Sequence, residues 1–197
     1  MASPAVPGLF FCFACMVLLL FASVSPPAWN AVNFLKAGTG SGETVYGVFG
    51  QCVKGGSCSH RNVCYNLNAL GADVVLDSKI LHNLSCTLIL HPITGALALL
   101  AMLMGLIAVC AASRFATILM GLLAILGSIV GLVIFVIDMV LWNVLKNRLT
   151  NNNYEAKLGN ANWLTLGGVV ALLLAACTSM CGACGRFATG RMAGEKY

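Results

Sequence analysis

The side chains that could carry chemistry are ten cysteines, three histidines and one acid inside a long apolar run. Four of the cysteines lie in, or at the end of, the one sizeable polar segment: Cys52, Cys58, Cys64 and Cys86. Thiols in a water-facing segment predict disulfides if that segment faces an oxidising compartment, and free thiols if it faces the cytosol. Four cysteines allow three pairings, and their spacing does not choose among them.

A second group of cysteines lies at the end of the last apolar run. Cys181 and Cys184 stand close to the basic residues Arg186, Arg191 and Lys196. Basic residues beside a membrane-spanning helix are typical of the cytoplasmic side, where nearby thiols are candidates for reversible palmitoylation. The Cys181-x-x-Cys184 spacing lacks a second ligand pair, so neither a metal site nor a cofactor is predicted.

His91 and Asp138 are the ionisable residues inside the apolar runs. Two uses of His91 are open: an interfacial side chain bonded to backbone or water, or a pH-sensitive group, because histidine ordinarily titrates near pH 6.5. Asp138 lies one turn before Trp142, a residue type typical of the membrane–water boundary. Asp138 is therefore either a boundary residue or a buried acid that binds a partner, since acids within the bilayer are often functional.

Four apolar runs must position these side chains. The 23 residues from Phe115 to Ile137 contain no ionisable side chain, and a helix of roughly 20 apolar residues spans the hydrocarbon core. Hydrophobic residues make up 59% of the chain and charged residues 9%, against about 25% charged in soluble domains, so membrane lipid is the expected surrounding. The runs predict helices over about residues 6–25, 86–112, 115–142 and 163–183.

The run over residues 6–25 has a second interpretation as a cleaved signal peptide, with Ser23 and Ser25 near a candidate cleavage site. No Lys or Arg precedes this run and Pro26 follows it directly, so an uncleaved helix is favoured. Four spans then form one membrane domain over residues 1–197, with both termini on the same side.

Polar segments separate the spans: a first loop over 29–85, a second loop over 143–162 and a tail over 184–197. Stretches rich in β-branched residues at 43–49 and 73–76, between glycines, predict a small sheet in the first loop. The sequon Asn83-Leu84-Ser85 makes Asn83 a candidate glycosylation site, although it lies only a few residues from the second span.

Small residues recur every four positions in two spans. They are Gly127 and Gly131 in the third, and Gly167, Ala171 and Ala175 in the fourth. This spacing lets helices approach closely. It favours a tight four-helix bundle within one chain, with homo-oligomerisation as the competing use of the same faces.

Charge and motifs exclude several classes of function. The net charge of +5 is spread along the chain, so nucleic acid is not an expected partner. No phosphate-binding glycine loop or nucleophile–base constellation is present, and neither an enzyme nor a small-molecule substrate is predicted. Basic residues do not decide the orientation: four of the eleven fall on the side of the termini and seven on the other.

Three stretches carry a resemblance to a known family. They are Tyr46-Gly-Val-Phe-Gly-Gln-Cys52 with Cys58-Ser59 following, Leu88-Ile-Leu-His-Pro-Ile-Thr-Gly95, and Phe135-Val-Ile-Asp138. Together they resemble the fungal PalI family of pH-response regulators and its eisosome-associated tetraspanner relatives, within the claudin-like superfamily. The resemblance implies an all-α integral membrane fold, a claudin-like four-transmembrane-helix bundle with a small disulfide-tied extracellular loop that contains β-strands.

The resemblance also implies disulfides, location and function. Cys52 would pair with Cys58, which leaves Cys64 and Cys86 for a second bridge, although Cys64 stands where the family more often has Gly. The protein would be a non-enzymatic, multi-pass plasma-membrane component of alkaline pH signalling, with both termini cytoplasmic, that assists a larger multi-span sensor. Many such proteins carry a long cytoplasmic tail, and a role that needs one is not expected here.

Under this hypothesis, His91, and more loosely His60 and His82, would lose charge as the pH rises. The alternative function is structural: a tetraspanner that organises plasma-membrane domains or contacts with the cell wall.

Overall fold

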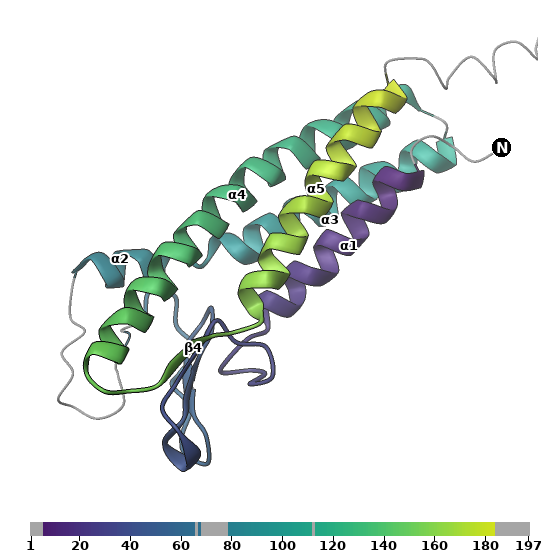
Figure 1. Ribbon diagram of the computed structural model, residues 1–197. Coiled ribbons are helices and arrows are strands. Elements are labelled where there is room, and N and C mark those ends of the chain that lie inside the picture. The colour runs from purple at the N-terminus through teal and green to yellow at the C-terminus, as the bar shows by residue number, and fades with distance from the viewer. Residues whose placement is uncertain (1–5, 66, 68–78, 112, 184–197) are drawn as a thin grey trace, which may run out of the picture. The chain divides into compact units, whose positions relative to one another are not determined.

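The computed structural model describes residues 6–65, 67, 79–111 and 113–183 (Figure 1). Its helices and strands, in chain order, are α1 Val6–Ser23, β1 Leu35–Ala37, β2 Thr44–Tyr46, β3 Gln51–Val53, α2 Lys79–Thr87, α3 Leu90–Ala111, α4 Arg114–Asn151, β4 Ala156–Leu158 and α5 Ala161–Ala183. A short 3-10 turn at Gly40–Gly42 lies between β1 and β2. Four candidate spans, Val6–Ser23, Leu81–Ala111, Arg114–Asn151 and Ala161–Cys181, are long and apolar enough to cross a membrane, which confirms the predicted four-span fold class.

The chain divides into two compact units. Within the described residues, unit 1 consists of helical segments from residues 6–18, 94–111, 114–130 and 167–183. Unit 2 contains residues 19–65, 67, 79–93 and 131–166 and holds all four strands. The sequence predicted one membrane domain, and the spans contribute residues to both units.

Unit 1 is a four-helix bundle with a core of small side chains. Gly8, Gly105 and Gly121 lie so close to neighbouring helices that a Cβ would crowd a methionine side chain at each position. Cys12, Cys15, Ala101 and Ala124 are fully buried in the same unit. Small residues let helix backbones approach, so van der Waals packing rather than water exclusion holds such a bundle together. The packed position of α1 favours its role as a retained span.

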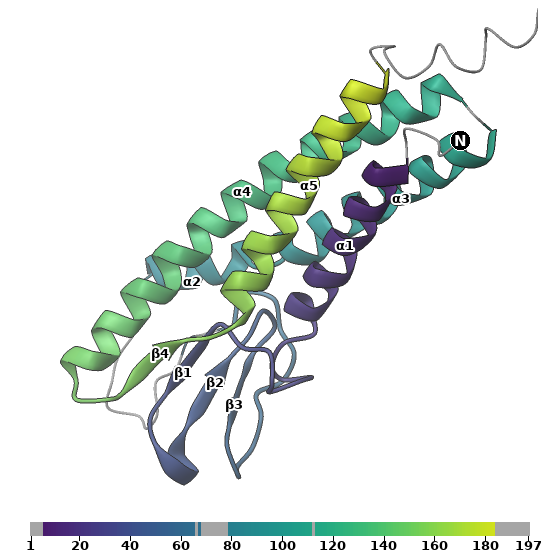
Figure 2. The ribbon, with the colours of Figure 1, turned by 45° about the vertical axis from the view of Figure 1, so that its right-hand side comes forward.

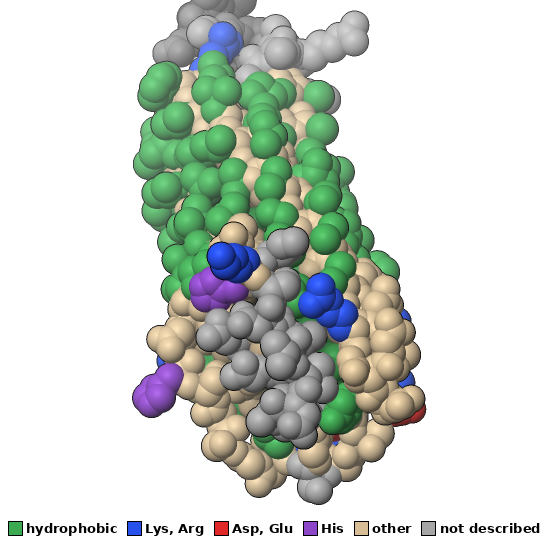
Figure 3. Space-filling model, turned by 90° about the vertical axis from the view of Figure 1, so that its left-hand side faces the viewer, with side chains coloured by type: hydrophobic (Ala, Val, Ile, Leu, Met, Phe, Trp, Pro, Cys, Tyr) green, Lys and Arg blue, Asp and Glu red, His purple; other side chains and the backbone are tan. Residues whose placement is uncertain are grey.

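The outward faces of the unit 1 helices carry the large apolar side chains. Phe10 is 64% exposed, Leu122 is 53% exposed and Ile129 is 57% exposed. Figure 3 shows hydrophobic side chains covering the helices on the face it presents. This distribution reverses that of a soluble protein, and it is expected when lipid tails are the solvent.

Unit 2 contains a four-stranded antiparallel sheet in the order β3-β2-β1-β4 (Figure 2). β1 pairs with β2 through Leu35↔Tyr46 and with β4 through Leu35↔Leu158. β4 comes from the second polar segment and the other three strands from the first, so the two polar segments form one sheet. We call this sheet, together with its connecting loops, the lobe. The sequence predicted a strand over residues 43–49, of which β2 is the part that forms, while the predicted strand at 73–76 lies outside the described residues.

The core of unit 2 joins the sheet to the end of α4. Leu141, Leu145 and Leu149 are fully buried at helical spacing, together with Phe34 and Leu35 from the lobe. Because this apolar stripe is covered by protein, α4 continues to Asn151. The prediction of a loop over residues 143–162 was therefore wrong for 143–151, and only β4 with its flanking turns remains of it.

Turn chemistry explains where α4 stops. Asn153 adopts a φ of 62°, the left-handed conformation that asparagine tolerates at helix C-termini. The backbone amide of Tyr154 donates to the carbonyl of Leu149, and the Asn152 side chain donates to the carbonyl of Arg148. The run of three asparagines is thus a helix cap.

Gly159, directly after β4, tests how closely the chain passes Asn33. An added Cβ at Gly159 would overlap the backbone carbonyl of Asn33, whereas one at Gly42 meets nothing within 4 Å. We expect Gly159→Ala to lower the free energy of unfolding by about 1–3 kcal/mol. The matched Gly42→Ala variant should change it by less than about 0.5 kcal/mol. Thermal unfolding of the full-length protein in detergent measures both, and equal effects would contradict the close approach.

Candidate functional site

The candidate site is a buried polar pair in unit 2. Nε2 of His91 lies 3.0 Å from Oδ2 of Asp138, and both side chains are completely buried. Nδ1 of the same imidazole lies 3.0 Å from the carbonyl oxygen of Leu88. The structure therefore brings together the two ionisable residues of the apolar runs, 47 positions apart in sequence. Asp138 is therefore buried and paired within this chain.

The donor and acceptor pattern limits the protonation of this pair. A carbonyl oxygen only accepts, so Nδ1 of His91 must carry a proton toward Leu88. One further proton can then lie between Nε2 and Oδ2 of Asp138. Thr165 lies beside the pair with its Oγ1 3.4 Å from Nε2, and its hydroxyl donates to the carbonyl of Ala161. With that further proton in place, the pair carries no net charge.

Aromatic side chains cover the pair. Phe34 presents its ring at 5.2 Å, edge to face, to His91 and stacks at 5.5 Å on Trp142. Tyr46 lies 6.3 Å from Trp142. Trp142 is fully buried in this cluster, whereas Trp29 and Trp163 are the exposed tryptophans. The place of Trp142 at the membrane–water boundary stays a prediction. Burial of Tyr46 in this cluster disfavours its charged form and so raises the pKa of its hydroxyl above the ordinary value.

Sequence reasoning missed Phe34 and Thr165 as members of the site. Thr165 stands in the fourth apolar run four residues after Ala161, a spacing at which a hydroxyl bonds back to the helix, so its polarity alone gives no signal. Phe34 lies between Asn33 and β1 in an ordinary loop pattern. Its position depends on the β1–β4 pairing, which no local pattern predicts.

The four predicted cysteines form two disulfides, Cys52–Cys58 and Cys64–Cys86. The first closes the turn beyond β3, and the second ties the end of the lobe to α2. Tyr65, next to Cys64, donates its hydroxyl to the carbonyl of Gly47 at 2.7 Å. Burial, and secondarily Tyr46, raises the pKa of Tyr65 well above its ordinary value.

The structure also places most of the remaining predicted residues. Asn83 is exposed on α2, and the hydroxyl of its sequon residue Ser85 is buried 3.0 Å from the carbonyl of Tyr65. Cys181 is exposed near the end of α5, and Cys184 lies outside the described residues. A Cβ on Gly127 would lie 3.1 Å from Leu172. The other small residues predicted to pack the third and fourth spans range from partly to fully buried: Gly131, Gly167, Ala171 and Ala175.

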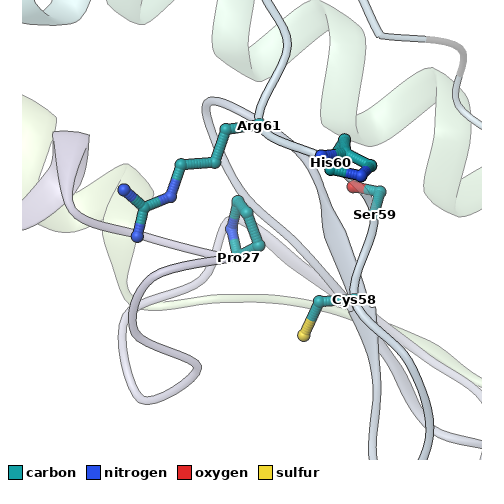
Figure 4. Close-up of a pocket in the computed structure, with 5 residues that line it drawn as sticks. All are labelled: Pro27, Cys58, Ser59, His60 and Arg61. Atoms are coloured by element: carbon teal, nitrogen blue, oxygen red, sulfur yellow. The ribbon is translucent and has the colours of Figure 1, made fainter.

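An open pocket of about 420 Å³ lies on the lobe, lined by Pro27, Cys58, Ser59, His60 and Arg61 (Figure 4). Its polar side chains come from one short segment, and His60 and Arg61 are exposed. No set of three His, Cys, Asp or Glu side chains among the described residues could hold a metal ion. The pocket therefore lacks the buried, convergent polar groups of a ligand site.

Comparison with known proteins identifies the family. A model of the SUR7/PalI family matches residues 4–179, so the chain belongs to the SUR7/PalI family of multi-pass membrane proteins. A search of curated proteins finds no match to the sequence. The stretches that contain His91 and Asp138, and the cysteine-bearing stretch of the lobe, all lie within the matched range.

The aromatic cluster predicts that Trp142 and Trp163 contribute very differently to the stability of the fold. Trp142 is fully buried and Trp163 is 66% exposed. We expect Trp142→Ala to lower the free energy of unfolding by about 3–5 kcal/mol because it leaves a cavity beside Phe34. Trp163→Ala should cost less than about 1 kcal/mol. Denaturant titration of the detergent-solubilised protein distinguishes them, and a larger loss for Trp163→Ala would refute the assignment.

The backbone conformation at Cys64 favours glycine at this position. Its φ is 60°, in the left-handed region where a Cβ costs about 1–2 kcal/mol. We compare Cys64→Gly with Cys64→Ala, each combined with Cys86→Ala so that neither variant has the second disulfide. The glycine variant should be more stable by about 1 kcal/mol. A more stable alanine variant would show that this backbone conformation is wrong.

Proposed function

We propose that this protein is a non-enzymatic plasma-membrane component of ambient alkaline pH signalling in a fungus, where it assists a larger multi-span pH sensor. The observation that carries the proposal is the SUR7/PalI family match over residues 4–179. The four spans and the folded lobe give such a protein two surfaces: helices for a membrane partner and a lobe for the outside of the cell.

The disulfides support an external lobe. Cys52–Cys58 and Cys64–Cys86 need an oxidising compartment, and the cytosol keeps thiols reduced. Because the described residues hold four candidate spans, an even number, an external lobe agrees with cytoplasmic termini. The exposed thiols Cys110, Cys177 and Cys181 belong to unit 1, and among them Cys181 is the candidate for palmitoylation with Cys184.

The packing within unit 1 limits how a partner helix can bind. Gly105, Gly121 and Gly127 already face side chains of this chain. A membrane partner, or a second copy of the protein, would therefore contact the large outward side chains such as Phe13, Leu103 and Leu126.

Deletion of the gene tests the proposal. We expect slower growth at alkaline pH with normal plasma-membrane patches, restored by the full-length protein. Affinity capture in mild detergent should then recover a multi-span membrane sensor. Disordered patches with normal alkaline growth would contradict the proposal and support the alternative, a structural tetraspanner that organises membrane domains.

A further inference from the structure

The starting observation is an unpartnered oxygen inside the buried pair. Oδ1 of Asp138 has no hydrogen-bond partner among the described residues, although the side chain is completely buried. A carboxylate spreads its negative charge over both oxygens, and leaving one of them buried without a donor is costly. A carboxylic acid avoids this cost, because it places its proton on Oδ2 and leaves Oδ1 as a neutral carbonyl oxygen.

The neighbours of the pair agree with a neutral acid. If Oδ2 of Asp138 donates to Nε2 of His91, the imidazole is neutral and its Nδ1 donates to Leu88. The hydroxyl proton of Thr165 is already directed to Ala161. Each of the three protons, on Oδ2 of Asp138, Nδ1 of His91 and Oγ1 of Thr165, then has one acceptor. The alternative, an imidazolium beside a carboxylate, keeps the same bonds but leaves charge on the unpartnered Oδ1.

The described residues that contact the pair from other elements are uncharged. α5 contributes the uncharged Thr165, and the lobe contributes Phe34. Among the described residues, Asp138 forms an ion pair with His91 alone. The other two ion pairs, Lys54–Glu43 and Lys157–Glu155, each join a lysine and a glutamate of the lobe. From the sheet, the titratable Tyr46 contacts Trp142.

We propose that the His91–Asp138 pair is a proton-dependent latch: it holds Phe34 and Trp142 in place while it shares one proton, and it releases them when alkaline pH removes that proton. Loss of the shared proton leaves one uncompensated negative charge in a fully buried site. The His91 ring contacts Phe34, and Phe34 stacks on Trp142, so movement of the pair toward water loosens the contact between the lobe and α4. The biological meaning of the latch rests on the proposed function.

Tryptophan fluorescence can follow the latch directly. The chain has three tryptophans, so the full-length variant Trp29→Phe/Trp163→Phe keeps Trp142 as the single reporter. In lipid nanodiscs, we expect Trp142 emission to shift to the red, and acrylamide quenching to rise at least twofold, between about pH 6 and about pH 9.5. Burial raises the pKa of Tyr46, which lies beside Trp142, and of Tyr65 above the ordinary tyrosine value of about 10, so these two tyrosines stay protonated over this interval.

Asp138→Asn on the same background is the decisive variant. Its amide donates to His91 as the acid does and has no proton to lose in this range, so we expect a flat pH profile. His60→Gln/His82→Gln removes the two other histidines and should keep the full transition. A transition that persists in Asp138→Asn, or one that disappears in the histidine double variant, overturns the latch. So does a parent protein without any transition.

A second measurement covers the case in which Asp138→Asn does not fold. Infrared difference spectroscopy of the parent should show the carbonyl band of a buried carboxylic acid near neutral pH, lost over the same interval as the fluorescence change. Absence of that band at neutral pH overturns the proposal. Both measurements use purified protein, so their failure leaves the alkaline-growth test unaffected, and failure of the growth test leaves the latch intact.

Discussion

A carboxyl group inside an apolar helix is costly unless another group shares its proton or its charge. Asp138 meets this requirement through His91, whose second nitrogen is fixed by the carbonyl of Leu88. The pair thereby fixes the rotation of α3 and α4 within unit 2, and it provides the surface on which Phe34 packs. The stack of Phe34 on Trp142 lies against that junction, and Leu35 of β1 and the apolar stripe of α4 belong to the same core.

The two units use different physical forces. Unit 1 buries glycine, alanine and cysteine between helices and turns large side chains outward, as expected where lipid removes the hydrophobic drive between helices. Unit 2 buries leucine and aromatic side chains against a sheet, as a water-soluble domain does. Two disulfides reinforce it by limiting the unfolded state of a lobe with a small core.

The sequence predicted the parts of this fold that depend on composition and local pattern. Four spans follow from apolar length, and the tight bundle from small residues at a spacing of four. The sequence did not predict β4, because pairing Lys36 with Lys157 depends on contacts between segments 121 positions apart. It singled out His91 and Asp138 but left their contact open, since spacing within each helix says nothing about the neighbour it meets. It did not show that Trp142 is covered by protein for the same reason: a tryptophan near a helix end suits both a lipid boundary and a covered core.

A double-mutant cycle on His91 and Asp138 tests the central role of the pair most directly. The four proteins are the parent, His91→Leu, Asp138→Leu and the double variant, each measured by denaturant titration in the same detergent. Each single change leaves a buried polar group without its partner, whereas the double change removes both. The account predicts that the double variant loses less stability than the two single variants summed, by about 1–3 kcal/mol. Additive losses would show that the two side chains do not stabilise the fold through each other.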